Sequence, residues 1–171
     1  AGGQTCVQVF FVRGGRNYGN RAYFPSHAAD EPTGAVLEAF LGQFYQNALP
    51  PAEVLASEAL PGHAVLAEAL SVRAERTVRV HVPKRGPRRL LLDHAVANAK
   101  DALTRRMAEN ATQRRLLEGL AHALGLEGPP ARIEVYDNSH ISGTDPFGAM
   151  IVATADGFLK SAYRKFSIRG K

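Results

Sequence analysis

Cysteine is almost absent from this sequence. Cys6 is the single cysteine among 171 residues, which excludes an internal disulfide and any cysteine cluster that could bind zinc or iron and sulfur. Long apolar runs are absent too, because none approaches the roughly 20 residues that a membrane-spanning helix needs. The first residues also lack a signal-peptide pattern. These absences favour a globular protein of a reducing compartment, and we expect a cytoplasmic chain with no membrane partner.

The length and composition fit a globular protein, with 45% hydrophobic and 22% charged residues. A chain of 171 residues can bury a core, and its length suits one domain, or one domain and part of another. The sequence starts at Ala1 without a methionine and ends in the basic segment Arg169-Gly170-Lys171. We interpret it as a piece of a longer protein.

The net charge of +5 and the pI near 9.7 favour an anionic partner. The cations gather in clusters along the chain: Arg13, Arg16 and Arg21; Lys84, Arg85, Arg88 and Arg89; Arg105, Arg106, Arg114 and Arg115; and Lys160, Arg164, Lys165, Arg169 and Lys171. Clusters on several elements could converge on one face that binds DNA. The alternative is a solvated basic surface without a special purpose.

Apolar periodicity predicts alternating strands and helices in the first 128 residues. The expected strands cover residues 5–12, 17–24, 53–55 and 77–82, and the expected helices cover residues 35–46, 63–70 and 90–124, the last with a break near Glu109-Asn110. Gly14-Gly15 is typical of a hairpin turn, since no helix follows it. A helix-ending glycine, Gly125, opens the linker expected at residues 125–130.

The next expected strand ends in an acid. Ile133, Val135 and Asp137 alternate with Glu134 and Tyr136, so one face carries two branched apolar side chains and then a carboxylate. A lone carboxylate at the end of a core-facing row is costly to bury unless it binds a cation or a partner charge. Asp137 is therefore our candidate metal ligand.

A turn-rich connection is expected at residues 138–148, then a strand at 149–155, a hairpin turn at Asp156-Gly157 and a returning strand at 158–168. The returning strand carries the cations Lys160, Arg164 and Lys165. A meander of three strands with a leading acid is how a ribonuclease-H-like fold begins, and that scaffold holds divalent metals against a phosphodiester. We predict the α/β class: a ribonuclease-H-like mixed sheet with flanking helices, followed by the first strands of a second such unit.

Several stretches resemble a known family. Residues 133–140 (IEVYDNSH), 148–152 and 160–168 look like the opening of the C-terminal nuclease domain of UvrC, the incising subunit of the bacterial UvrABC excinuclease. Residues 8–16 and 36–45 resemble the segment that precedes that domain in the same family. The resemblance covers essentially the whole chain.

This resemblance implies a role in nucleotide excision repair. UvrC-like proteins cut the damaged strand on both sides of a lesion, and their C-terminal ribonuclease-H-like domain makes the 5′ cut with a divalent metal. By resemblance, Asp137 is the first catalytic acid and a ligand of Mg²⁺ or Mn²⁺ in the intact protein. The implied partners are damaged duplex DNA and UvrB, with UvrA upstream in the pathway. The family's second acid and catalytic histidine lie beyond Lys171, so we expect the fragment alone to be inactive.

An internal echo points to a duplication. The hairpin expected at residues 7–24 parallels residues 149–166 in its strand, glycine turn and basic strand. We predict that residues 1–128 form a partial, non-catalytic ribonuclease-H-like unit that lacks its first strand. Residues 129–171 would then form the first three strands of the C-terminal nuclease domain. The alternative is that two short hairpins merely look alike.

Further side chains are candidates for DNA binding: His140, Lys160, Arg164, Lys165, Lys84, Arg85, Arg88 and Arg89. His140 is close enough to Asp137 to help bind metal or phosphate, although a histidine in a loop of this kind is as often merely exposed. The basic segment at residues 84–89 could follow a phosphate backbone or simply lead into a helix. The alternative function is a non-catalytic scaffold that binds DNA or docks a protein, with Asp137 in an internal salt bridge.

Overall fold

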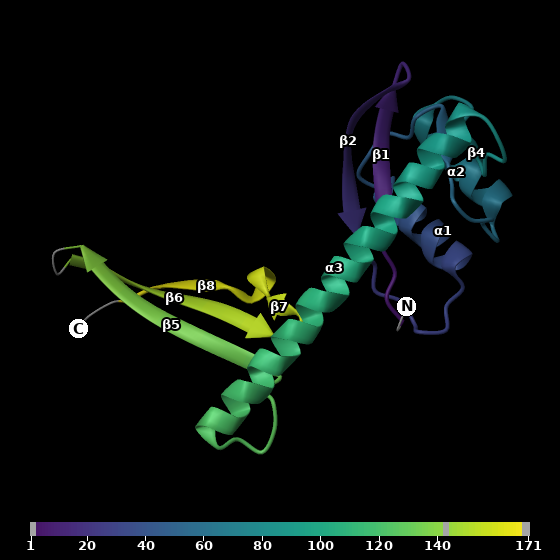
Figure 1. The fold of residues 1–171 in the computed structure, drawn as a ribbon. Coiled ribbons are helices and arrows are strands. Elements are labelled where there is room, and N and C mark those ends of the chain that lie inside the picture. The colour runs from purple at the N-terminus through teal and green to yellow at the C-terminus, as the bar shows by residue number, and fades with distance from the viewer. Residues whose placement is uncertain (1–2, 142–143, 169–171) are drawn as a thin grey trace. The chain divides into compact units, whose positions relative to one another are not determined.

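A computed structural model describes residues 3–141 and 144–168, without the side chains of His140, Ile141, Thr144 and Asp145. Its contacts divide the chain into two compact units, residues 1–104 and residues 105–171, and each is described by itself. Helices and strands occur together, which confirms the predicted α/β class (Figure 1). None of the helices in the described residues is both long and apolar enough to span a membrane.

The first unit contains two small sheets and the helices that cover them. Its elements are β1 (Val7–Arg13), β2 (Arg16–Tyr23), α1 (Thr33–Phe44), β3 (Glu53–Leu55), α2 (His63–Ala74), β4 (Arg79–His81) and the start of α3 (Pro87–Leu124). β1 pairs with β2 in antiparallel fashion, and β3 pairs with β4 in parallel fashion. The predicted strands and helices of this region are therefore all present, with ends that differ by a few residues.

The hairpin turn between β1 and β2 is the one predicted at Gly14-Gly15. Both glycines have positive φ angles, +54° and +75°, and Arg13 pairs with Arg16 across the turn. A two-residue loop with two positive φ angles has the twist that antiparallel strands need, and glycine adopts it without a steric cost.

The core of the first unit lies between α1, α2 and the parallel pair of strands. Leu41 of α1, Leu70 of α2, Val54 of β3 and Val80 of β4 belong to one buried cluster. The hairpin joins this core through aromatic contacts, since the ring of Tyr23 lies 5.1 Å from that of Phe40 between centroids. The periodic apolar residues of the sequence thus face one another, as amphipathic patterning predicts.

The helix α3 runs without interruption from Pro87 to Leu124. The prediction of a break near Glu109-Asn110 was wrong. A single asparagine inside a helix costs at most about 0.7 kcal/mol relative to alanine, which is too little to end the helix. The predicted end is confirmed. Gly125 has φ +64°, and the Leu126 N–H donates to the carbonyl oxygen of Ala121 at 2.9 Å, the hydrogen bond of a Schellman cap.

The second unit holds a four-stranded antiparallel sheet. Its strands are β5 (Arg132–Ile141), β6 (Thr144–Thr154), β7 (Gly157–Phe158) and β8 (Arg164–Ser167), with a 3₁₀ turn η1 (Lys160–Ala162) before β8. β6 is central, because β5 pairs along one edge while β7 and β8 pair in succession along the other. Among the described side chains of β6, Met150 and Val152 are buried.

Two sequence predictions for this sheet were wrong. Residues 138–148 are mostly strand and not a turn-rich connection, because Asn138 pairs with Gly148 and extends the ladder of β5 and β6. The returning strand at 158–168 is interrupted, because Ala162 N–H bonds to the Leu159 carbonyl oxygen at 3.0 Å and closes a local turn. Lys160 therefore lies on η1 and not on a strand.

The contacts place the division of the chain inside α3, after Thr104. The sequence placed it after residue 128, inside the glycine- and proline-rich segment at residues 125–130. A continuous helix can belong to two compact units at its two ends, so the predicted domain limits of 1–128 and 129–171 stay a prediction.

Candidate metal and nucleic-acid site

Asp137 lies in the middle of β5, on an exposed position of the sheet in the second unit. It pairs with Ala149 of β6, and Ala149 pairs in turn with Lys165 of β8. Side chains of directly paired residues project to the same face of a sheet. The sheet therefore presents an acid and a cation on one face, with a small alanine between them.

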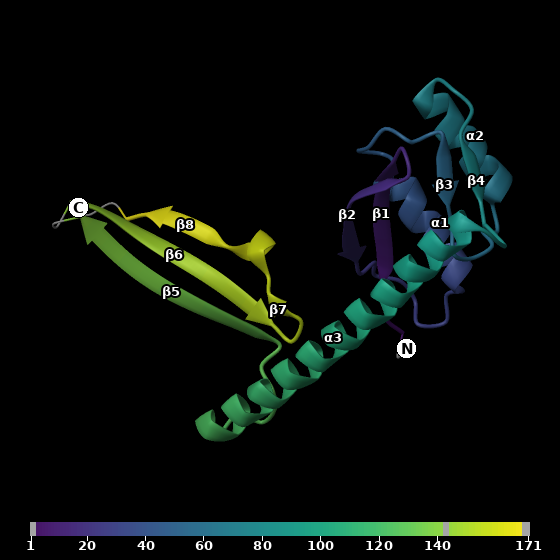
Figure 2. The same cartoon turned by 45° about the horizontal axis from the view of Figure 1, so that its top comes forward.

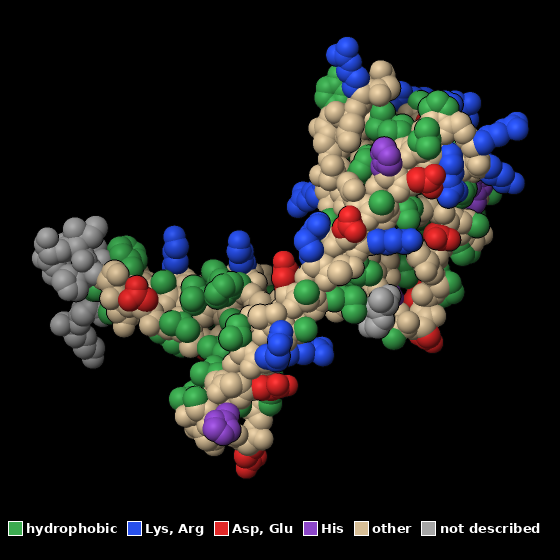
Figure 3. All heavy atoms as spheres, in the orientation of Figure 1, with side chains coloured by type: hydrophobic (Ala, Val, Ile, Leu, Met, Phe, Trp, Pro, Cys, Tyr) green, Lys and Arg blue, Asp and Glu red, His purple; other side chains and the backbone are tan. Residues whose placement is uncertain are grey.

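This face also exposes apolar side chains, and we call it the Asp137 face. Val135, Phe147 and Ile151 alternate in phase with Asp137 and Ala149, and Val135 and Phe147 are 51% and 52% exposed. The opposite face of β6 carries the buried residues Met150 and Val152. Exposed hydrophobic and basic side chains lie next to one another over this sheet in Figure 3. Along β6, the Asp137 face is thus the more exposed of the two.

The carboxylate of Asp137 has no ion-pair or hydrogen-bond partner among the residues that the structure describes. Glu134 shows the contrasting arrangement on the opposite face. The Tyr136 hydroxyl and the Arg132 Nε donate to its two oxygens at 2.6 and 2.7 Å. The hydrogen bond from Tyr136 and then that from Arg132 lower the pKa of Glu134, while the same contact raises the pKa of Tyr136.

One exposed carboxylate does not make a metal site. Divalent metals such as Mg²⁺ take several oxygen ligands, and within residues 3–141 and 144–168 no group of three or more His, Cys, Asp or Glu side chains could hold an ion. Asp137 has the right chemistry for one ligand of such a site. The described residues alone do not fit a complete one.

The basic residues of this sheet that were predicted to bind DNA do not all lie on the same face. Lys165 shares the Asp137 face, whereas Arg164 pairs with Met150 and so lies on the other face. Arg164 Nη1 also donates to the carbonyl oxygens of Ser161 and Tyr163 at 3.0 and 2.8 Å. The side chain of His140 lies outside the described residues, so its predicted role stays a prediction.

The basic segment of the first unit is not one loop. Lys84 and Arg85 are exposed in the connection after β4, but α3 begins at Pro87 and includes the other two cations. Arg88 Nε donates to Glu53 Oε2 at 3.0 Å, and Arg89 Nη2 lies 2.9 Å from Asp93 Oδ1. Two of the four cations are therefore already paired with acids of the same unit, which reduces what they can offer to phosphates.

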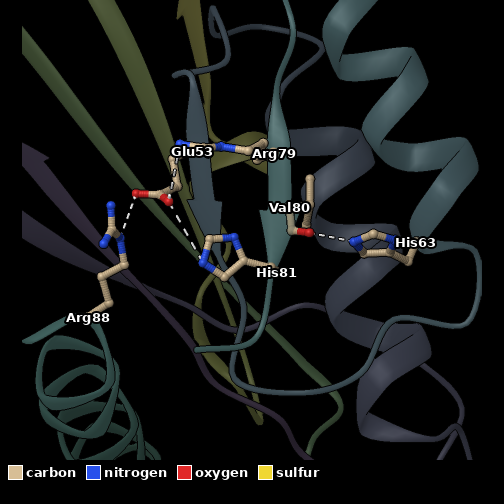
Figure 4. A network of polar contacts seen from close by, with 6 residues as sticks. All are labelled: Glu53, His63, Arg79, Val80, His81 and Arg88. Atoms are coloured by element: carbon tan, nitrogen blue, oxygen red, sulfur yellow. Dashed lines mark hydrogen bonds and ion pairs between the residues drawn. The ribbon is translucent and has the colours of Figure 1, made fainter. Parts of the chain in front are cut away.

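Sequence reasoning missed the group around Glu53 (Figure 4). This side chain, on β3, lies 3.9 Å from Arg79 Nη2 and 3.8 Å from His81 Nε2 in addition to the contact with Arg88. The next strand also contacts α2, because the His63 ring bonds to the Val80 carbonyl oxygen. The alternation of Arg79 and His81 along β4 was the available signal, and their shared partner is 26 or more residues away in the sequence.

Comparison with known proteins identifies the family. The model of the UvrC ribonuclease H-like domain matches residues 1–106, and that of the UvrC RNAse H endonuclease domain matches residues 121–171. This chain belongs to the UvrC family. Both regions thus carry ribonuclease-H-like matches, in agreement with the predicted fold class.

Curated UvrC relatives match nearly the whole chain. UvrABC system protein C of Rhodospirillum rubrum is 61% identical over 169 residues, 99% of this chain and 26% of that protein. The proteins of the same name from Paramagnetospirillum magneticum and Ruegeria pomeroyi are 59% and 54% identical and are each covered to 27%. The chain therefore spans about a quarter of the length of these UvrC relatives. No solved structure matches it.

Proposed function

We propose that this chain is part of a DNA endonuclease subunit of nucleotide excision repair, which incises damaged DNA by metal-dependent hydrolysis of a phosphodiester. The family matches over both regions and the 61% identity with a UvrABC system protein C support this proposal. The observation that carries it is the position of Asp137, an exposed acid on a strand inside the region matched by the endonuclease model, with no ion-pair or hydrogen-bond partner among the described residues.

In the longer protein, Asp137 is one ligand of Mg²⁺ or Mn²⁺, and acids outside this chain complete the site. The metal, when bound, activates water and stabilises the leaving oxygen. Lys165, on the same face, is placed to contact a neighbouring phosphate. The chain alone is inactive, because a single carboxylate does not fix a divalent ion against a phosphodiester.

The proposed partners are damaged duplex DNA and UvrB, with UvrA acting earlier in the same system. The net charge of +5 and the exposed Lys84 and Arg85 favour a polyanionic partner. The first unit takes no part in the chemistry in this proposal. It grips DNA in this proposal.

Substitution of Asp137 in the longer protein tests the proposal. Asp137→Asn keeps the size of the side chain and removes the charge, so incision of a lesion-containing duplex should fall by at least a hundredfold while DNA binding and the unfolding temperature stay unchanged. Asp156→Asn is the matched control, since Asp156 is an exposed acid in the turn before β7. Normal incision by Asp137→Asn would refute the catalytic role.

The second candidate is a non-catalytic module that binds DNA or positions a partner. Arg88 and Arg89 form ion pairs with acids of their own unit, which favours a structural role for these two cations over DNA binding. The internal salt bridge predicted for Asp137 under this alternative is not found among the described residues, so Asp137→Asn should then leave incision, DNA binding and the unfolding temperature unchanged. The same variant therefore separates the two functions.

A further inference from the structure

The hairpin of β1 and β2 carries three arginines and no acid. Arg13 is the last residue of β1, Arg16 is the first of β2, and Arg21 lies further along β2. All three are exposed, and the first Asp or Glu of the whole sequence is Asp30, which comes after the hairpin. In Figure 2, β2 is the outer strand of the pair, on the side away from β3. The hairpin therefore presents positive charge without an acid of its own to compensate it.

A bulge in β2 brings Arg16 and Arg21 onto one face of the hairpin. The pairing shows that β2 has one more residue than β1 over the same stretch: Phe10 pairs with Asn20, and Val12 pairs with Asn17. Gly19 lies inside this bulge with φ +128°, a backbone conformation that L-residues rarely adopt. Without the bulge, Arg16 and Arg21 would lie on opposite faces, because they are an odd number of residues apart. Bulges often aim a side chain at a functional site.

The register defines the face that carries the arginines, which we call the arginine face. Arg13 pairs with Arg16, and Val9 pairs with Arg21. Val9 and Arg13 are four residues apart on β1, so their side chains and those of their partners project to the same side. At a rise of about 3.4 Å per residue, Arg21 lies about 14 Å along the hairpin from the other two arginines. Phe11 alternates in phase with Val9 and Arg13 and is 42% exposed.

The arginine face lacks partners for its charges. In the part of the chain that the structure describes, none of the three guanidinium groups forms an ion pair, and that of Arg21 lies 5.1 Å from the centroid of the Tyr23 ring. Arg88 of the same unit, by contrast, is paired with an acid. Arg13 and Arg16 even stand directly opposite each other, and like charges in this position destabilise a hairpin. An anion bound between them would offset this repulsion, and functional sites are where such local conflicts are expected.

We propose that the arginine face binds the phosphate backbone of duplex DNA. This inference rests on the proposed function, because it names the surface with which the first unit grips DNA. A guanidinium group binds phosphate oxygens in bidentate fashion, which favours arginine over lysine at such contacts. Each DNA strand carries a phosphate about every 3.4 Å along the helix axis, so a row of cations about 14 Å long can meet separate phosphates at its two ends. Contacts of this kind position a protein on a duplex without reading its sequence.

Removal of the three charges in the longer protein tests the proposal. The combined variant Arg13→Gln, Arg16→Gln and Arg21→Gln loses three phosphate contacts, so the slope of log affinity against log salt should become shallower by about 2.7. Affinity for a labelled duplex in about 0.1 M salt should fall by about tenfold or more, as measured by fluorescence anisotropy. The unfolding temperature should not fall, because the three side chains are exposed and form no ion pair among the described residues. An unchanged slope overturns the proposal.

An exchange of two neighbouring residues separates the arginine face from net charge. Asn20→Arg together with Arg21→Asn keeps the composition and the net charge, but it moves the cation to the opposite face of the hairpin. The slope should then become shallower by about 0.9, as with Arg21→Asn alone. Asn20→Ala is the matched control, since it removes only the exposed hydrogen bond from Gln8 to Asn20. A slope equal to that of the unmodified protein would mean that the position of the charge is irrelevant, and would overturn the proposal.

Failure of this proposal can be told apart from failure of the proposed function. If the arginine variants bind duplex DNA normally while Asp137→Asn loses incision, the arginine face does not bind DNA and the nuclease proposal stands. If the arginine variants bind DNA weakly with the predicted slopes while Asp137→Asn incises normally, the arginine face stands and the nuclease proposal fails. Normal DNA binding with weaker association with UvrB would assign the arginine face to a protein partner and overturn the proposal.

Discussion

Asp137 and Lys165 stand in one cross-strand row, with Ala149 between them. Their backbones are two strand spacings apart, about 9 to 10 Å. No ion pair joins the two side chains among the described residues. The ammonium group of Lys165 therefore remains available to an anion beside the acid. A phosphate that reached a cation held by Asp137 would meet this second positive charge.

Loss of the Lys165 charge should weaken DNA binding in a salt-dependent way. In the longer protein, Lys165→Gln removes one phosphate contact, so the slope of log affinity against log salt should become shallower by about 0.9. Fluorescence anisotropy with a labelled duplex at several salt concentrations measures this slope. Lys100→Gln, an exposed lysine of α3, is the control. Equal slopes for Lys165→Gln and the unmodified protein would show that Lys165 makes no phosphate contact.

The isolated chain of 171 residues should leave DNA intact. With magnesium or manganese present, a supercoiled plasmid should remain uncut over hours, because Asp137 is one carboxylate and a metal site needs several oxygen ligands. Asp137→Asn in the same chain is the control for contaminating nucleases. Metal-dependent nicking that disappears in Asp137→Asn would contradict the prediction and would mean that this chain holds a complete site.

Local chemistry made part of this fold predictable. The turn at Gly14-Gly15 and the helix end at Gly125 follow from glycine's access to positive φ, which needs no knowledge of distant residues. The extension of β5 through Asn138 does not, because a polar residue becomes part of a strand only when Gly148 pairs with it. In the same way, nothing in the sequence indicates that Arg88 forms an ion pair, because its partner Glu53 lies on a distant strand. What escaped the sequence is pairing between residues that are far apart along the chain.

In the candidate site around Asp137 too, local features could be predicted and pairing between distant residues could not. Alternation correctly places Asp137 on the same face as Val135, but the predictions that the strand ends at Asp137 and that this row faces the core were wrong, because β5 continues to Ile141 and Val135 is 51% exposed. The position of Lys165 on the same face as Asp137 could not be predicted, because the interruption by η1 resets the register between Lys160 and β8. Arg164 and Lys165 are adjacent in β8 and therefore lie on opposite faces, but only the pairing with β6 shows which of the two shares the face of Asp137.

Two glycine substitutions should change stability in opposite directions. Gly15 has φ +75°, a conformation that costs an L-residue about 1 to 2 kcal/mol, so Gly15→Ala should destabilise the chain by about that amount. Gly42 lies inside α1, and a Cβ there would meet nothing within 4 Å. Gly42→Ala should therefore stabilise by about 0.5 to 1 kcal/mol. Urea unfolding measures both, and equal signs would contradict the turn geometry.

Removal of the Tyr136 hydroxyl should raise the pKa of Glu134. The hydrogen bond from Tyr136 is the largest cause of the lowered pKa, so Tyr136→Phe leaves Arg132 as the remaining donor and moves the value back toward the usual range. A carboxyl whose folded pKa is depressed contributes stability above its unfolded pKa, and the contribution is lost as pH falls through the folded pKa. The variant should therefore lose stability near neutral pH and show a smaller further loss on acidification. NMR titration of the Glu134 carboxyl measures the shift, with Tyr163→Phe as control, and an unchanged pKa in Tyr136→Phe would mean that this hydrogen bond does not form in solution.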